Sequence, residues 1–193
     1  MSHPDFKAPG KRVKLTGRSS TLRGLFIVTL TPYVEPTEHE VDEALSILKM
    51  DRGRVTCAYC GGKKSEWDHF RPVVRDLAPT GYITEIANLV PSCGKCNQSK
   101  SGSDWKKWIT GSAPQSPSRT LDQASLDGKI SCLEAFENWR EPVRIDYASI
   151  LGAERLKQHM SHLKNVLNIL ESAEREALHL RNDVEQWLAK GDA

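Results

Sequence analysis

Four cysteines in two Cys-x-x-Cys pairs are the residues whose type and spacing most directly suggest chemistry. Cys57 pairs with Cys60, Cys93 pairs with Cys96, and residues 61–92 lie between the two pairs. Four thiolates in two such knuckles suit tetrahedral Zn²⁺. Free, paired cysteines of this kind fit a reducing cytoplasm better than a disulfide framework. We therefore predict a structural zinc site in a cytoplasmic protein.

A second group of polar side chains suits a different kind of site. Asp68 and His69 are adjacent, Asn88 follows them, and Asn97 comes directly after the last cysteine. Carboxylate and amide oxygens are ligands that Mg²⁺ accepts, and histidine is the side chain best placed to take a proton near pH 7. Neighbouring residues on a strand point to opposite faces, so His69 could activate a water without binding the metal held by Asp68. This combination suits phosphodiester hydrolysis.

The segment 57–102 resembles the HNH nuclease family, whose fold is the ββα-metal finger. The resemblance implies that Asp68 and Asn97 are ligands of a catalytic Mg²⁺ or Mn²⁺ ion and that His69 is the general base. It also implies that Asn88 orients the active-site loop, that the cysteine knuckles hold Zn²⁺, and that DNA is the substrate. The chain departs from the family pattern by ending the motif in Asn rather than His. It also has a longer segment between His69 and Asn88 than compact members have.

Basic side chains are concentrated in two regions, although the net charge is only +2. Residues 1–24 hold six Lys and Arg against one Asp, and residues 49–108 hold eleven against six Asp and Glu. This asymmetry suggests a face that meets a polyanion, and a solvated surface is the alternative. The candidates for nucleic-acid contact are Lys11, Arg12, Lys14, Arg71, Arg75 and Lys100. For Lys100, a solvated lysine and a phosphate contact are equally consistent with the sequence.

Two strands and a helix must position the candidate site. We expect the first strand and its exit over residues 67–74, a long connection over 75–86, and the second strand over 88–91. A helix beginning between residues 92 and 95 would carry Asn97, and residues 103–110 would add a further helical turn. The predicted fold class is therefore α+β, with a ββα-metal core and zinc knuckles.

The segment before the cysteines predicts an arm, a strand and a helix. Residues 1–24 are basic and punctuated by glycine, which indicates little structure of their own. Residues 25–30 are apolar and β-branched, so we expect a short buried strand or extended segment before Pro32. A capping box begins at Thr37 and predicts a helix to about residue 49.

The segment after the core predicts a linker and helices. Residues 111–120 are rich in Pro and Ser and indicate a linker, and residues 131–140 a short helix. Helix formers without proline dominate residues 152–190. Within that helix, a row of apolar residues recurs every seven positions: Leu156, Leu163, Leu170, Ala177 and Val184. The row can pack on the nuclease core, or it can join a second chain or a larger assembly.

The boundaries that follow are a basic arm with strand and helix at 1–50, the HNH cassette at 51–110, and a linker with helices at 111–193. We expect them to form a single compact unit. No apolar run is long enough to cross a membrane, and no secretory signal is predicted. The leading hypothesis is a metal-dependent DNA endonuclease in restriction or phage defence. The alternatives are a zinc-dependent nucleic-acid-binding module without catalysis, and a nuclease subunit of a larger defence complex.

Overall fold

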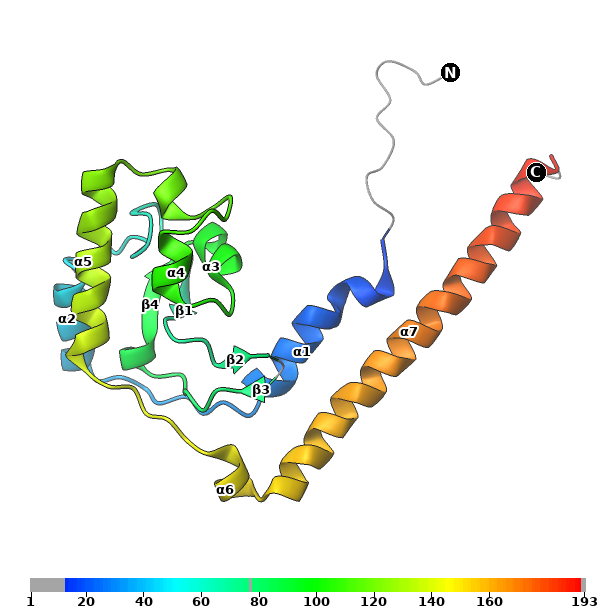
Figure 1. Ribbon diagram of the computed structural model, residues 1–193, viewed down its shortest axis with the longest axis horizontal. Helices are drawn as coiled ribbons and strands as arrows, with labels where there is room; N and C mark the ends of the chain where they lie inside the picture. The colour runs from blue at the N-terminus through cyan, green and yellow to red at the C-terminus, as the bar shows by residue number, and fades with distance from the viewer. Residues whose placement is uncertain (1–12, 77, 192–193) are drawn as a thin grey trace, which may run out of the picture. The chain divides into compact units, whose positions relative to one another are not determined.

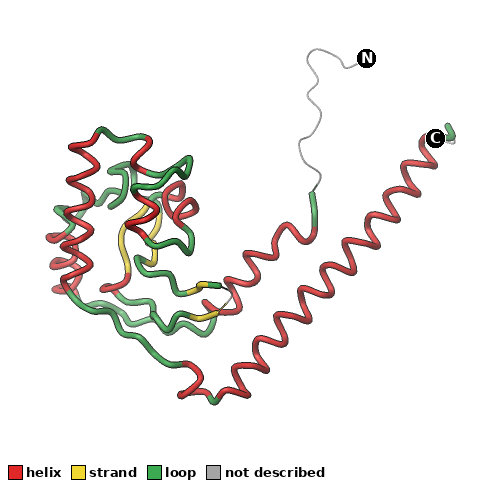
Figure 2. The backbone as a smooth tube through the Cα atoms, viewed as in Figure 1, coloured by secondary structure: helices red, strands yellow, loops and turns green. Residues whose placement is uncertain are grey.

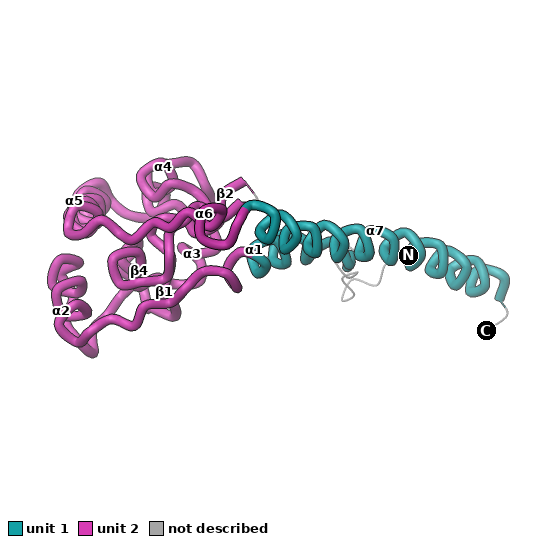
Figure 3. The backbone as a smooth tube through the Cα atoms, turned by 90° about the horizontal axis from the view of Figure 1, so that it is seen from below, with its two compact units in different colours: residues 1–26, 153–193 teal, residues 27–152 magenta. Residues whose placement is uncertain are grey.

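The computed structural model describes residues 13–76 and 78–191, and it combines helices with two small antiparallel sheets (Figures 1 and 2). The α+β class predicted from the sequence is confirmed. The contacts divide the chain into two compact units, residues 27–152 and the residues up to Phe26 together with those from Ala153 onward (Figure 3). The expected arm residues Lys11 and Arg12 lie outside the described residues.

The centre of the 27–152 unit is a hairpin followed by a helix. Strand β1 (Glu66–His69) pairs antiparallel with β4 (Leu89–Ser92), and helix α3 (Gly94–Lys100) follows at once. Asn88 ends the short 3-10 helix η2 (Ile86–Asn88), so it lies just before the second strand rather than inside it. The ββα arrangement expected for this region is present.

The long connection between the two central strands has a structure that the sequence did not indicate. A small hairpin of β2 (Val74–Arg75) and β3 (Ala78–Pro79) lies at its start. Further along the connection, Gly81 has a φ of +93°, and a Cβ built on it would lie 2.5 Å from the carbonyl oxygen of Ile145. Glycine is therefore required where residues 81–82 meet the segment after α5.

Helices from both flanks complete the core of this unit. Helix α2 (Glu38–Ile47) begins at the predicted capping box, and α4 (Trp105–Ile109) is the predicted further turn. Helix α5 (Gln123–Trp139) is longer than the predicted 131–140 helix because Asp122 caps it eight residues earlier. The helices α2 and α5 lie side by side in Figure 1 and contact each other. The aromatic rings of Phe70, Trp105 and Phe136 pack together between these elements.

The predicted 111–120 linker is wrong, because part of it is built into the core. It contains the 3-10 helix η3 (Pro117–Arg119), and Ser116 just before it is fully buried. The Ser116 hydroxyl donates to the carbonyl oxygens of Trp108 and Ile109 at 2.8 and 2.9 Å. Carbonyl groups at a helix end have no partner inside the helix, so this segment satisfies the end of α4.

The described residues of the second unit are almost entirely helical. The 3-10 helix η1 (Leu15–Arg18) runs into α1 (Ser19–Val28), and α7 (Ala153–Ala189) follows the short α6 (Tyr147–Leu151) of the other unit. The strand predicted over residues 25–30 is wrong, since most of that segment belongs to α1. Tertiary contacts override the β propensity of this segment. The Phe26 ring packs on the His159 ring of α7, and the His159 Nε2 forms a hydrogen bond with the Phe26 carbonyl oxygen.

The long helix predicted over residues 152–190 is confirmed, but its apolar row is buried only in part. Leu163 and Leu167 are buried, whereas Val184 and Leu188 are more than half exposed. The Glu174 carboxylate accepts a bond from the Leu15 N–H, so the contact with η1 lies near the middle of α7. No helix within the described residues is both long and apolar enough to cross a membrane.

Candidate metal centre and active site

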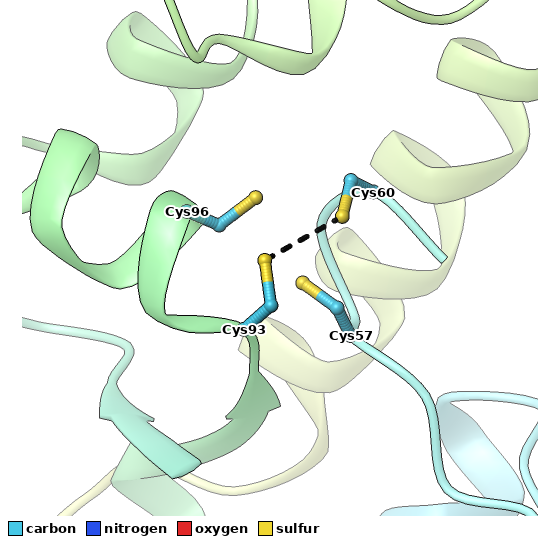
Figure 4. A group of neighbouring side chains, drawn as sticks. All are labelled: Cys57, Cys60, Cys93 and Cys96. Atoms are coloured by element: carbon cyan, nitrogen blue, oxygen red, sulfur yellow. Dashed lines mark hydrogen bonds between the residues drawn. The ribbon is translucent and has the colours of Figure 1, made fainter. Parts of the chain in front are cut away.

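The four cysteines converge from two separate segments. Cys57 and Cys60 lie in a tight loop before β1, closed by the bond from the Gly61 N–H to the Cys57 carbonyl at 2.8 Å. Cys93 caps the start of α3, and Cys96 lies in its first turn. Figure 4 shows their side chains pointing toward one another. All four sulfurs lie within 4.8 Å of one another.

This geometry fits zinc. The Sγ atoms of Cys60 and Cys93 are 3.8 Å apart. A tetrahedron with Zn–S bonds of about 2.3 Å has sulfurs roughly 3.8 Å apart. A hydrogen bond from Cys96 lowers the pKa of Cys57, and the same bond raises the pKa of Cys96. The four cysteines are thus positioned to bind a metal ion.

Asp68 is held in place by two donors on a single oxygen. The Tyr59 hydroxyl donates to Asp68 Oδ2 at 2.6 Å, and the Lys100 Nζ lies 2.9 Å from the same atom. Asp68 is 5% exposed and Lys100 is fully buried. Burial raises the pKa of Asp68, and the Lys100 charge and the Tyr59 hydrogen bond act against that rise.

Lys100 is therefore neither a solvated lysine nor a phosphate contact, the two roles that the sequence allowed. Its ammonium group donates a second bond, to the His69 carbonyl oxygen at 2.9 Å. A side chain without exposed surface is not solvated, and it does not meet a phosphate in this arrangement. The physical reason is the buried Asp68 carboxylate, since a buried charge must be paired. Lys100 therefore joins α3 to β1 through contacts with both residues of the Asp-His pair.

His69 faces a different set of partners from Asp68, as adjacent strand residues should. Its Nε2 lies 2.8 Å from the Thr84 hydroxyl. Burial lowers the pKa of His69, and the nearby Lys100 charge lowers it further, so both favour the neutral ring. Thr84 itself is fixed by backbone bonds to Pro32 and Val34, at 3.0 and 2.9 Å. The segment before α2 thus holds the group that orients the imidazole.

The two asparagines occupy different kinds of position. Asn88 is fully buried, and its Nδ2 donates to the carbonyl oxygens of Arg71 and Ile83 at 3.1 and 3.2 Å. Its Oδ1 accepts the Arg71 N–H at 2.8 Å, so Asn88 joins the loop after β1 to the segment before β4. Asn97 is half-buried, one turn before Lys100 on α3. Residues three apart share a helix face, so Asn97 lies on the face that Lys100 turns toward β1.

The remaining basic candidates are spread over the molecule. Arg71 is half-buried, Arg75 is exposed on β2, and Lys14 is exposed in the other unit. The structure therefore brings together Asp68, His69 and Lys100, with Asn88 and Arg71 beside them. Tyr59 and Thr84 belong to the same arrangement, and sequence inspection missed both. Tyr59 stands inside the first knuckle, where an aromatic residue suggests core packing, and Thr84 carries no local signal at all.

Comparison with known proteins bears on the segment that contains these groups. Residues 57–103 match the family model described as HNH endonuclease. The HNH domain covers about a quarter of the chain and includes all four cysteines and the Asp-His pair. No curated protein and no solved structure matches the chain. An HNH domain indicates a nuclease or nucleic-acid-binding role.

Proposed function

We propose that the protein is a metal-dependent endonuclease that hydrolyses DNA phosphodiester bonds. The observation that carries this proposal is the Asp68–His69 pair, with the carboxylate fixed by Lys100 and the neutral imidazole fixed by a separate partner. A base needs a neutral ring whose orientation is set before the reaction. An HNH domain that only binds nucleic acid would need neither the fixed carboxylate nor the oriented imidazole.

Each residue has a distinct role in the proposed reaction. His69 would take a proton from the attacking water through Nδ1, in the tautomer whose Nε2–H donates to the Thr84 hydroxyl. Asn88 holds the loop after β1 at a fixed distance from the segment before β4. Asp68, through the oxygen that Tyr59 and Lys100 leave open, and Asn97 would hold Mg²⁺ or Mn²⁺. Such an ion stabilises charge on the phosphate and on the leaving 3′ oxygen. The cysteine cluster takes Zn²⁺, which is structural because four thiolates leave no open position.

A second candidate is a zinc-dependent nucleic-acid-binding module without catalysis. One observation favours it: the Lys100 ammonium already neutralises Asp68, where the first candidate requires a divalent ion. An ammonium group and a metal ion on the same carboxylate repel each other, which weakens metal binding. Metal-dependent cleavage separates the two candidates.

For the biological setting we propose restriction or phage defence. The reason is that a compact HNH chain with flanking segments resembles the stand-alone nucleases of those systems. A second copy or a defence-complex partner would bind through residues 152–190. Exposed apolar residues of α7 support this, and they are Ile169, Leu178, Leu180, Val184, Trp187 and Leu188. Light scattering on the purified protein distinguishes a dimer from a monomer.

The test of function is incubation of zinc-loaded protein with supercoiled plasmid and with single-stranded RNA. We expect nicked or linear plasmid in Mg²⁺ or Mn²⁺ and intact plasmid in Ca²⁺-only buffer, since Ca²⁺ prefers a looser coordination shell than Mg²⁺. Plasmid that is bound in a gel-shift assay but stays intact with every metal would favour the binding module. Cleavage of RNA alone would replace DNA as the substrate.

A further inference from the structure

A pocket of about 510 Å³ lies beside the candidate active site, in the 27–152 unit. It is lined by the loop after β1, by the β2–β3 hairpin, and by residues from α4, α5 and the segment after α5. Three of its lining residues are arginines: Arg71, Arg75 and Arg144. Neither Asp68 nor His69 lines it, so it is a separate site next to the reacting groups.

The Arg71 guanidinium in this pocket is held in place but poorly hydrogen-bonded. Its Cζ lies 5.8 Å from the centre of the Phe70 ring and 5.9 Å from that of Tyr82. Its Nη2 donates one long bond of 3.4 Å to the Glu137 carbonyl oxygen. Its Nη1 is buried and has no hydrogen-bond partner among residues 13–76 and 78–191. A buried donor without a partner is costly, so the Arg71 side chain would gain a partner by shifting toward an anion in the pocket.

Arg144 lines the same pocket and also lies against the Tyr82 ring. Its Cζ lies 5.6 Å from the Tyr82 ring centre, and its Nε donates to the Thr80 carbonyl oxygen at 3.0 Å. An antiparallel bridge joins residue 144 to Tyr82, at the place where Gly81 is required. Two guanidinium groups thus lie against one ring in the same pocket.

The carboxylates around the pocket compete only weakly for these guanidinium groups. Glu137 accepts the Trp105 indole N–H and pairs with Lys106, both at 3.2 Å. Asp104 caps α4 by accepting the Lys107 N–H at 3.0 Å. Asp76 is the acidic lining residue for which residues 13–76 and 78–191 provide no such bond. The arginines therefore retain donors for an incoming anion.

We propose that this pocket binds a backbone phosphate of the nucleic acid next to the phosphate that is cleaved. Guanidinium groups match the oxygens of a phosphate with paired hydrogen bonds. Arg71 follows His69 by two residues, and the Asn88 amide clamps its backbone. A phosphate held by Arg71 and Arg144 would therefore lie next to the segment that carries the Asp-His pair. This inference rests on the proposed function, since it assigns a subsite to the same substrate.

The test compares Arg71→Met and Arg144→Met, singly and together, with Arg119→Met as a matched control. Arg119 is exposed and does not line the pocket. All variants are made in a His69→Ala background so that labelled duplex DNA is bound without cleavage. Losing one phosphate contact should lower the log–log salt slope by about 0.9 and weaken binding roughly tenfold at about 50 mM salt. The control should keep the parent slope, and circular dichroism confirms that each variant is folded.

A second measurement uses inorganic phosphate alone. Phosphate should raise the midpoint of thermal unfolding relative to chloride at equal ionic strength, and the double variant should lose that effect. A phosphate effect with an unchanged DNA slope overturns the subsite and leaves a site for a free anion. If all slopes match the control while the wild type cuts plasmid, the inference fails and the proposed function stands. If the wild type neither binds nor cuts DNA, the proposed function fails.

Discussion

Replacing Cys93 with serine should unfold the HNH domain rather than only slow it. Cys93 supplies one of four converging sulfurs and is the N-cap residue of α3, which carries Asn97 and Lys100. Structural zinc sites contribute about 10–16 kcal/mol of apparent binding free energy, and much of this is folding free energy. Domains of this size are stable by only about 5–15 kcal/mol. We therefore expect loss of zinc and a large loss of helical circular dichroism.

Cys132→Ser is the matched control, because Cys132 lies in α5, away from the cluster. It should retain about one zinc per chain, as a single closed four-thiolate site holds. Chelation of the wild type should reproduce the Cys93→Ser state, and added zinc should reverse it. A wild-type protein that is fully folded after zinc removal would contradict the structural role of the cluster.

Lys100→Met should destabilise the protein by about 3–5 kcal/mol, because it leaves a buried carboxylate without its charged partner. Methionine keeps the volume of the side chain and removes its ammonium group, so the loss reports on the Asp68 pair and on the bond to the His69 carbonyl. Chemical denaturation in the presence of zinc measures the free energy of unfolding.

Lys95→Met provides the comparison within the same helix, since Lys95 is exposed. Its cost should stay within about 0.5 kcal/mol, as for most surface substitutions. Adding Asp68→Asn to Lys100→Met should recover much of the lost stability, because the unpaired charge is then gone. Equal small losses for Lys100→Met and Lys95→Met would show that the ion pair is not buried in solution.

The parts of the site that sequence inspection predicted are those with a local signature. The cysteine knuckles, the capping box at Thr37, and the order of strand, strand and helix each depend on residues close together in the chain. Charges and turn residues at fixed offsets are enough to predict such features. The same logic identified the Asp-His pair as the centre of interest.

The parts that it could not predict depend on contacts between distant residues. Lys100 carries the same local signal as an exposed lysine, and its burial follows from a carboxylate 32 residues away, at Asp68. Thr84 becomes relevant only because the loop folds back onto His69. The helix over Ser19–Val28 replaces an expected strand because its ring contacts lie on α7, more than a hundred residues later. Intrinsic propensity yields to such packing.

The most direct test of the central claim is the single-turnover rate of plasmid cleavage by wild type and by His69→Ala in Mg²⁺. Both proteins should be folded, contain zinc and bind the plasmid equally, so that the rate reports on the reaction alone. Loss of a general base typically costs about 10²–10⁴-fold, and we expect a loss in that range for His69→Ala. Equal rates for the two proteins would contradict the assignment of His69 as the base and, with it, the proposed catalytic site.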